Sequence, residues 1–499
     1  MSPFGIKKNI FKRTMKNQLK RTSLFSAGLL LTSSPYLSAQ KNEKKPNILF
    51  IITDQQFAEA MSCRMGNQFL KTPNMDKMAA EGVVFTQAYC SNPISVPSRS
   101  SMFTGRYTHE TGMSRNPKVK EPVPEIYNSG LKNMGQYFQE AGYQTAYYGK
   151  SHLMYELKNV KESGFENVIE SDNDSVVARD AVNYLKTKSA NPFLLVASFT
   201  NPHNVCEYAR NLRGRNQRLT CGEIGYPAKS DSLPLVPYNL ASQQDEPDGL
   251  TLLKKAYQNE GGQFPVGDYT ATDWQKLRWG YYRMIEKVDA QIGLILQTLK
   301  NMNLDGNTLI VFTSDHGECA GAHGWNQKTV FYEESTRVPF IIRYKGTVSA
   351  SQNNKLVNTG IDILPTMLDF AGQKTPKELP GKSVKPLATG KSAGKWREYV
   401  VVENHLAQAS GLVNGKIPEL EGRMVRTERY KYCVYSKGNK RESLVDLQKD
   451  PGEMINLATN PKFHNILLQH RTLLRQFGKQ YKDSLALKLL ESDVQPLPF

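Results

Sequence analysis

The chain has 499 residues, of which 39% are hydrophobic and 10% are aromatic, and its formal net charge is +17. This apolar content is enough to build a buried core, and the length predicts one large domain followed by a smaller one. The positive charge alone does not indicate a nucleic-acid-binding protein, because much of it lies at the N-terminus.

Residues 1–39 have the pattern of a secretory signal peptide. Seven Lys and Arg residues and no acidic residue lie within residues 1–21, an apolar run follows at 24–31, and residues 37–39 fit a cleavage site before Gln40. The apolar run is too short to span a bilayer. We therefore expect an exported protein, in the periplasm or at the cell surface of a Gram-negative bacterium, with no stable membrane span and no nucleic-acid partner. Removing the segment would lower the net charge to about +10, which fits an anionic substrate or simple solubility.

Strand and helix patterns alternate from residue 47 to residue 371. Continuous apolar runs indicate strands that are buried on both faces, and the alternation predicts an α/β fold, doubly wound around a mostly parallel central sheet. The expected strands are 47–53, 83–89, 144–148, 193–199, 308–313 and 339–344, and the expected helices are 72–82, 131–141, 176–186, 274–302 and 361–371. Between Cys206 and Asp268 lies a long loop-rich insertion, which is either a substrate wall or a merely solvated segment.

Residues 375–395 are rich in Lys, Gly, Pro and Ser and are typical of a linker. Alternating patterns beyond it predict a smaller α+β subdomain, with strands at 399–402, 422–426, 430–435 and 442–447 and a closing helix at 465–481. We therefore divide the chain into a signal peptide (1–39), a catalytic domain (40–375) and a C-terminal subdomain (376–499).

The six cysteines form no Cys-x-x-Cys pair, so neither a zinc ribbon nor a redox motif is indicated. Export permits disulfides, and Cys206 with Cys221 would close a modest loop. Free buried thiols fit the same residues equally well.

Residues 90–106 form the most informative stretch. Pro97 suits the first turn of a helix, and Ser95 and Ser98 are residues that cap helices. The free N–H groups of such a helix start favour an anion, and Arg99 lies about one turn from Ser95, where it can meet the same anion. From these residues alone, an ordinary helix cap is an equally good interpretation.

The whole stretch, Ser95-x-Pro97-x-Arg99 followed by Thr-Gly-Arg at 104–106, resembles the sulfatase signature. The resemblance implies an alkaline phosphatase-like fold and hydrolysis of sulfate esters. It also implies that the first residue of the motif, here Ser95, is oxidised to Cα-formylglycine (3-oxoalanine), whose hydrated aldehyde is the nucleophile. A serine at this position is similar to the serine-type subgroup, which implies a radical-SAM maturase as a partner during biosynthesis.

Polar residues follow several expected strands, at the edge where open α/β sheets bind ligands. By the resemblance, a metal ion is held by Asp54, Gln55, Ser95, Asp315 and His316. Oxygen ligands favour a hard cation, Ca²⁺ or Mg²⁺, and of the two we expect Ca²⁺. The chain departs from the family at two of these positions. Gln55 replaces a common Asp and His316 replaces a common Asn, so whether the His316 nitrogen binds the metal or only hydrogen-bonds the substrate stays open.

The resemblance also implies cationic residues around the sulfate. These are Lys150 and His152 in Gly-Lys-Ser-His-Leu, His203 in Asn-Pro-His, and Lys328 in a downstream lysine segment. We expect Arg99, Lys150 and Lys328 to stabilise the negative charge of the transition state. We expect His203, aided by Lys328, to be the general acid, and His152 to accept a proton during sulfate release.

The expected substrate is a sulfated carbohydrate, such as a glycosaminoglycan or a mucin-type glycan. Arg210 and Arg213 in the insertion and His405 in the C-terminal subdomain are candidate contacts to the sugar. Two other functions remain open at this point. One is a phosphate monoester or diester hydrolase that uses unmodified Ser95, and the other is a non-catalytic relative that binds sulfated glycans.

Overall fold

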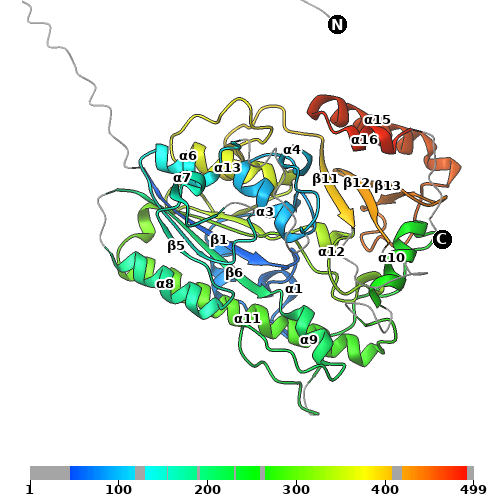
Figure 1. The fold of residues 1–499 in the computed structure, drawn as a ribbon, viewed down its shortest axis with the longest axis horizontal. Helices are drawn as coiled ribbons and strands as arrows, with labels where there is room; N and C mark the ends of the chain where they lie inside the picture. Colours follow the sequence, from blue (N-terminus) through cyan, green and yellow to red (C-terminus); the bar gives the residue numbers. More distant parts are fainter. Residues whose placement is uncertain are drawn as a thin grey trace, which may run out of the picture. The chain divides into compact units, whose positions relative to one another are not determined.

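A central eight-stranded sheet organises the part of the chain that the structure describes (Figure 1). The structure is a computed structural model. It describes residues 45–117, 130–153, 156–187, 191–229, 232–258, 265–406 and 418–491. The predicted signal peptide lies outside the described residues. The strands, in spatial order, are β5 (Asn167–Ile169), β4 (Gln144–Gly149), β6 (Phe193–Pro202), β1 (Asn47–Asp54), β7 (Thr308–Ser314), β8 (Phe340–Arg343), β2 (Val83–Phe85) and β9 (Ser351–Asn353). Neighbours from β5 to β7 are parallel, and β8 is antiparallel to both β7 and β2. This is the mostly parallel sheet that the sequence predicts.

Helices cover both faces of this sheet, and β1 shows why. Successive side chains of a strand point to opposite faces. Leu49 and Ile51 accordingly join the core on one side, whereas Ile48, Phe50 and Ile52 join the core on the other. The first side carries α2 (Pro73–Ala80), α8 (Asp174–Lys186), α9 (Val205–Asn211) and α11 (Ala271–Asn301), and the second carries α3 (Ser95–Thr104), α6 (Met134–Glu140) and α13 (Thr359–Phe370).

The structure differs from the predicted elements at two places. The expected strand at 83–89 is broken by a turn at Thr86 and Gln87, so that Ala88–Tyr89 (β3) pairs instead with Val357–Asn358 (β10) in a separate two-stranded sheet. The insertion contains helices as well as loops, namely α9 and α10 (Asp248–Gln258). The remaining short helices are α1 (Ser62–Met65), α4 (Thr108–Thr111), α7 (Val160–Ser163), α12 (Glu333–Thr336) and α14 (Lys385–Ala388), with 3-10 turns at Asp305–Asn307, Ala322–Gly324 and Pro461–Phe463. Nowhere in the described ranges is there a helix with both the length and the apolar character needed to cross a membrane.

The predicted C-terminal sheet is confirmed. Its four antiparallel strands, in spatial order, are β11 (Tyr399–Leu406), β12 (Leu420–Thr427), β13 (Tyr430–Tyr435) and β14 (Glu442–Asp446). Two helices, α15 (His464–Tyr481) and α16 (Ser484–Leu489), complete a core that contains Val425, Leu444 and Phe477. The described residues from 45 to 491 nevertheless belong to a single compact unit, so the boundary at residue 375 remains a prediction.

Strand β11 connects the C-terminal sheet to the segment that precedes Ser95. The Glu403 amide donates to the carbonyl of Ser91 at 2.9 Å, and the Asn404 side chain donates to the carbonyl of Thr329. The Thr329 amide in turn donates to the carbonyl of Pro93 at 3.1 Å. The smaller sheet therefore supports the loops on both sides of the predicted site.

A half-buried histidine also links helix α4 to the C-terminal subdomain. The Nδ1 atom of His109 in α4 lies 2.8 Å from Glu403 Oε1, and its Nε2 lies 2.9 Å from the carbonyl oxygen of Tyr481. Both partners accept hydrogen bonds and neither donates, so this geometry requires the imidazolium form. Desolvation opposes that form, but the charges of Glu403 and Asp483 outweigh it and raise the pKa of His109 to about 9.

This geometry predicts a stability loss at alkaline pH. Because the pKa of His109 is raised on folding, its stabilising contribution is complete below the ordinary histidine pKa of about 6.5 and is lost as the pH rises through about 9. His109→Gln should therefore show a smaller decline in stability than the wild type between about pH 7 and 10 in urea denaturation, by on the order of 2 kcal/mol. His470→Gln is the control, because the pKa of His470 is lowered and its contribution changes only at acidic pH. Equal slopes for wild type and His109→Gln would contradict the assignment.

Candidate active site

Four neighbouring strands bring the predicted residues to one edge of the sheet. Because β4, β6, β1 and β7 are adjacent and parallel, their carboxyl ends lie together. Asp54 is the last residue of β1, and the others follow the ends of β4, β6 and β7: Lys150, His203, and the pair Asp315 and His316.

Ser95 is the first residue of α3. The N-cap is Ile94, whose side chain makes no capping bond, so Ser95 and Ser98 do not cap this helix as their residue type predicts. Instead, the Ser95 hydroxyl turns toward the strand ends, with Oγ 3.1 Å from His316 Nε2 and 3.3 Å from Asp54 Oδ2. The helix start is completely buried, which leaves the hydroxyl facing only the site.

Arg99 and Lys150 are paired with the carboxylates. Arg99 Nε lies 2.8 Å from Asp315 Oδ2, and its Nη2 lies 3.4 Å from Asp54 Oδ2. Lys150 Nζ lies 2.8 Å from the same Asp54 oxygen. A third donor of Arg99, Nη1, reaches Ser198 Oγ at 2.7 Å and the carbonyl of Lys150 at 3.0 Å. Arg99 therefore connects α3 to the carboxyl ends of the four strands β1, β4, β6 and β7.

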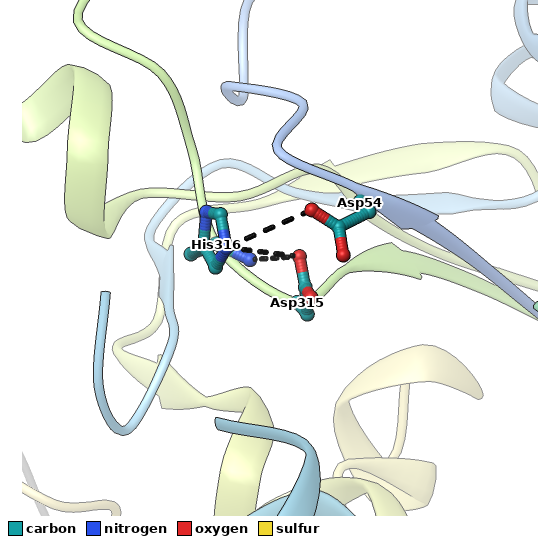
Figure 2. A group of neighbouring side chains, drawn as sticks. All are labelled: Asp54, Asp315 and His316. Atoms are coloured by element: carbon teal, nitrogen blue, oxygen red, sulfur yellow. Dashed lines mark hydrogen bonds and ion pairs between the residues drawn. The ribbon is translucent and has the colours of Figure 1, made fainter. Parts of the chain in front are cut away.

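Asp54, Asp315 and His316 form a group that fits a divalent cation (Figure 2). Each offers one ligand atom, and these atoms lie within 4.8 Å of one another. Among the described residues, Asp54 Oδ1 is buried and has no hydrogen-bond partner, although it points toward His316 Nε2 at 3.8 Å. A buried carboxylate oxygen without a donor is costly unless a cation completes it.

The protonation states suit metal binding. Desolvation would raise the pKa of Asp54, but the charges of Lys150, Lys328 and Arg99 hold it well below its usual range. Desolvation lowers the pKa of His316 to about 4, against the opposing charge of Asp315. The Nδ1 of His316 lies 3.0 Å from the carbonyl of Gly317, which fixes its proton there and leaves the Nε2 lone pair facing the group. Near neutral pH the site therefore presents an ionised Asp54 carboxylate and a neutral His316 imidazole, the forms that bind metals.

The side chain of Gln55 lies in a different arrangement. Its Oε1 accepts a hydrogen bond from Lys328 Nζ at 2.5 Å, and its Nε2 donates to Glu318 Oε2 at 2.5 Å. Only its backbone amide reaches the metal group, donating to Asp315 Oδ1 at 3.1 Å. The amide oxygen that the resemblance assigns to the metal therefore lies next to the Lys328 ammonium, and its role as a metal ligand stays a prediction.

His152, His203 and Lys328 surround this group. Desolvation and then the charge of Lys150 lower the pKa of both imidazoles. His152 is the more solvent-exposed of the two, and Lys328 is buried. Both histidines are therefore neutral near pH 7 before an anion enters.

The three residues expected to contact the sugar have partners within the protein. Arg210 in α9 donates to Gln217 Oε1 at 2.9 Å. Arg213 donates to the carbonyl of Pro265 at 3.2 Å and lies over the ring of Tyr269. His405 Nε2 lies 3.9 Å from Glu419 Oε2. These contacts show how the three side chains are held within the protein, and their role in substrate binding stays a prediction.

Two details of the site were not predicted from the sequence. Glu318 and Ser198 contact the site residues. Glu318 stands three residues after Asp315 among small residues, and Ser198 lies within β6, so neither follows the pattern of a polar residue placed directly after a strand. All six cysteines are free thiols, so the disulfide considered between Cys206 and Cys221 does not form, and Cys206 lies beneath the site with its Sγ 3.0 Å from Gln327 Nε2.

The carboxyl edge of this sheet therefore holds a buried group of residues that fits a divalent cation, a hydroxyl at a helix start and several cationic side chains. This combination is typical of enzymes that hydrolyse anionic esters. The sulfatase family model matches residues 46–373, and a model of the C-terminal region of N-sulphoglucosamine sulphohydrolase matches residues 321–480. The chain therefore belongs to the sulfatase family, whose activity is the hydrolysis of sulfuric esters.

Individual relatives agree with this assignment. The chain is 30% identical to a delta 4,5-hexuronate-2-O-sulfatase of Bacteroides thetaiotaomicron, over 91% of this chain and 93% of that protein. It is 28% identical to an N-acetylglucosamine-6-O-sulfatase of the same organism, over 94% and 92%. A solved 2-O GAG sulfatase is 29% identical and superposes with a TM-score of 0.76, covering 91% of this chain and 95% of that one.

The turn that presents Lys150 supplies a testable prediction. Gly149 has φ +111°, and a Cβ there would lie 1.9 Å from the carbonyl oxygen of Ser198. Gly149→Ala should therefore displace Lys150, destabilise the fold by at least about 3 kcal/mol and reduce turnover. Gly142→Ala is the control, because Gly142 has φ +79° but open space around it, and it should cost only about 1 kcal/mol. Similar losses in chemical denaturation for both variants would show that backbone strain alone matters.

Proposed function

We propose that this protein removes sulfate from sulfated carbohydrate, using a formylglycine formed from Ser95 and a bound Ca²⁺. The observation that carries the proposal is the position of the Ser95 hydroxyl, which lies within hydrogen-bonding distance of both Asp54 and His316. Asp54, Gln55, Asp315, His316 and residue 95 would hold the cation. Their oxygen atoms suit a hard cation, and Ca²⁺ tolerates irregular coordination geometry better than Mg²⁺, which requires a near-ideal octahedron. The bound cation would supply positive charge next to the sulfate.

Unmodified Ser95 is a poor nucleophile at this place. A serine hydroxyl needs a general base or a metal ion to activate it, and the nitrogen nearest to the Ser95 hydroxyl is His316 Nε2 at 3.1 Å. That lone pair faces the proposed cation, so with the cation bound only metal coordination would be left to activate the serine. Formylglycine would supply a geminal diol instead, which favours the sulfatase over the hydrolase that uses plain serine.

The chain's own cations then bind and orient the sulfate. Arg99 and Lys150 hold Asp54 and Asp315 in place, and Lys328 adds a further buried positive charge. Fixed charges of this kind act without reorganisation when negative charge develops.

Proton transfer to the departing sugar oxygen falls to His203 with Lys328. His203 is neutral before substrate binds, because desolvation and the charges of Lys150 and Lys328 lower its pKa. A bound sulfate opposes those charges and so favours the protonated imidazole. His152, which is neutral for the same reasons, would accept the proton during sulfate release.

The substrate class is proposed from the relatives and from the insertion. Both named relatives act on sulfated sugars, one at a 2-O and one at a 6-O position. Arg210, Arg213 and His405 are the side chains that we propose for sugar contact. Residues 1–39 are proposed as the export signal, and a serine-type maturase as the biosynthetic partner.

Replacing the nucleophile tests this function. Ser95→Ala should reduce sulfate release from 4-nitrophenyl sulfate and from a panel of sulfated disaccharides by at least about 10⁴-fold while leaving the fold intact. Ser100→Ala is the matched control, since Ser100 is buried in the same helix and its hydroxyl has no hydrogen-bond partner among the described residues. An active Ser95→Ala variant would rule out the assignment.

The preparation must contain the modified residue. Peptide mass spectrometry should find residue 95 lighter by two hydrogen atoms when the protein is produced with a serine-type maturase. Protein produced without the maturase should fold normally and be nearly inactive. A faster turnover of 4-nitrophenyl phosphate by unmodified protein would favour the phosphate hydrolase instead.

A further inference from the structure

A buried carboxylate from another helix holds the His203 turn, which comprises residues 200–204. Asp174, the first residue of α8, accepts a hydrogen bond from the backbone amide of Thr200 at 2.7 Å. Its other carboxylate oxygen accepts from the side-chain amide of Asn201 at 2.7 Å. The carboxylate therefore fixes both the backbone and a side chain at the start of the His203 turn.

A further contact closes the His203 turn from its other end. The Oδ1 atom of Asn201 accepts a hydrogen bond from the backbone amide of Asn204, the N-cap of α9, at 3.1 Å. Asp174 is 4% exposed and Asn201 is 0% exposed, so water does not compete for these bonds. A buried carboxylate is costly without donors, and Asp174 has one on each oxygen. The His203 turn is thus held on both sides of the histidine.

The backbone sets the position of the His203 imidazole. Within the described part of the chain, no hydrogen bond to another residue holds this ring, whereas the His316 ring is anchored through Nδ1 to the carbonyl of Gly317. The backbone of His203 is bonded at both groups: its amide donates to the carbonyl of Thr200 at 3.2 Å, and its carbonyl accepts from the amide of Cys206 at 3.1 Å. A displacement of the His203 turn would therefore displace the imidazole with it.

We propose that Asp174 and Asn201 are positioning residues for His203 and keep its imidazole where it can protonate the departing sugar oxygen. This inference rests on the proposed function, in which His203 with Lys328 is the proton donor. A general acid must lie within about 2.6–3.2 Å of the oxygen that it protonates, so a shift of about 1 Å in the His203 turn is enough to impair proton transfer. The metal group would stay in place, because its residues come from the ends of other strands, β1 and β7.

Asp174→Asn tests this role on the matured enzyme. Asparagine keeps the shape of the side chain, but its Nδ2 cannot accept a hydrogen bond, so the contact to Thr200 or the one to Asn201 is lost. Phenyl sulfate and 4-nitrophenyl sulfate release phenols that differ by roughly three pKa units, and only the poorer leaving group depends strongly on protonation. Asp174→Asn should lower kcat/KM for phenyl sulfate at least about tenfold more than for 4-nitrophenyl sulfate. Equal losses on both substrates would overturn the proposal.

Asp289→Asn is the matched control. Asp289 in α11 accepts hydrogen bonds from the side-chain amide of Asn74 and from the backbone amide of Met75, both at 2.8 Å. Desolvation raises the pKa of Asp174 and of Asp289 to about 6, so the two carboxylates have similar surroundings. Asp289→Asn should destabilise the protein in urea denaturation as Asp174→Asn does, with an unchanged ratio between the two substrates. An equal change of that ratio in the control would contradict a specific role of Asp174.

Asn201→Ala is an independent variant, and it replaces Asp174→Asn if the latter does not fold. It removes the contacts to Asp174 and to the Asn204 amide and leaves the carboxylate bonded to Thr200. The ratio between the two substrates should move in the same direction, and an unchanged ratio in the folded variant would count against the proposal.

A binding measurement separates positioning from general damage to the site. Calcium binding to metal-stripped protein, measured by calorimetry, should change less than about twofold in Asp174→Asn and Asn201→Ala. A weakening of at least about tenfold would show that the whole site is disturbed and would overturn the specific role. Failure of the proposed function would appear separately, as a wild type that releases no sulfate from 4-nitrophenyl sulfate.

Discussion

The site depends on one buried guanidinium. Arg99 bonds carboxylates that end two adjacent strands, Asp315 at 2.8 Å and Asp54 at 3.4 Å, and it lies one helical turn after Ser95. A buried arginine is stable only when carboxylates and carbonyls take up its donors, and removing one partner leaves a charge that water does not reach. The same contacts that satisfy Arg99 therefore set the distance between the helix start and the strand ends, which places the Ser95 hydroxyl at the metal group.

The charges around the site explain why it suits an anionic ester. Three buried cations, Arg99, Lys150 and Lys328, lie near the carboxyl groups of Asp54 and Asp315, and a divalent cation would add further positive charge. A sulfate group entering this field offsets charge that the protein already carries. The carboxylates offset the repulsion among the cations when the protein folds. The cations are therefore already in position when negative charge develops during the reaction.

Sequence patterns predicted the strands and helices that follow from repeating apolar residues, and they missed the features that depend on individual contacts. Apolar runs and polar strand ends located β1, β4, β6 and β7 and most of the site, because parallel neighbours necessarily end at one edge. They failed between residues 83 and 89, where a turn divides one apolar run between two sheets. They also assigned capping roles to Ser95 and Ser98, because residue type indicates a cap but not the direction of a hydroxyl.

By itself, the sequence determined the fold class, because apolar periodicity is a local pattern, and the family, because the motif around Ser95 resembles the sulfatase signature. Only the tertiary structure decided how the site residues are partnered. It showed that Arg99 and Lys150 bind carboxylates, that Asp54 Oδ1 has no donor among the described residues, and that Gln55 bonds Lys328. The physical reason is that hydrogen bonds and ion pairs join residues far apart in the chain, such as Gln55, Glu318 and Lys328, whose distances arise only when the sheet has assembled.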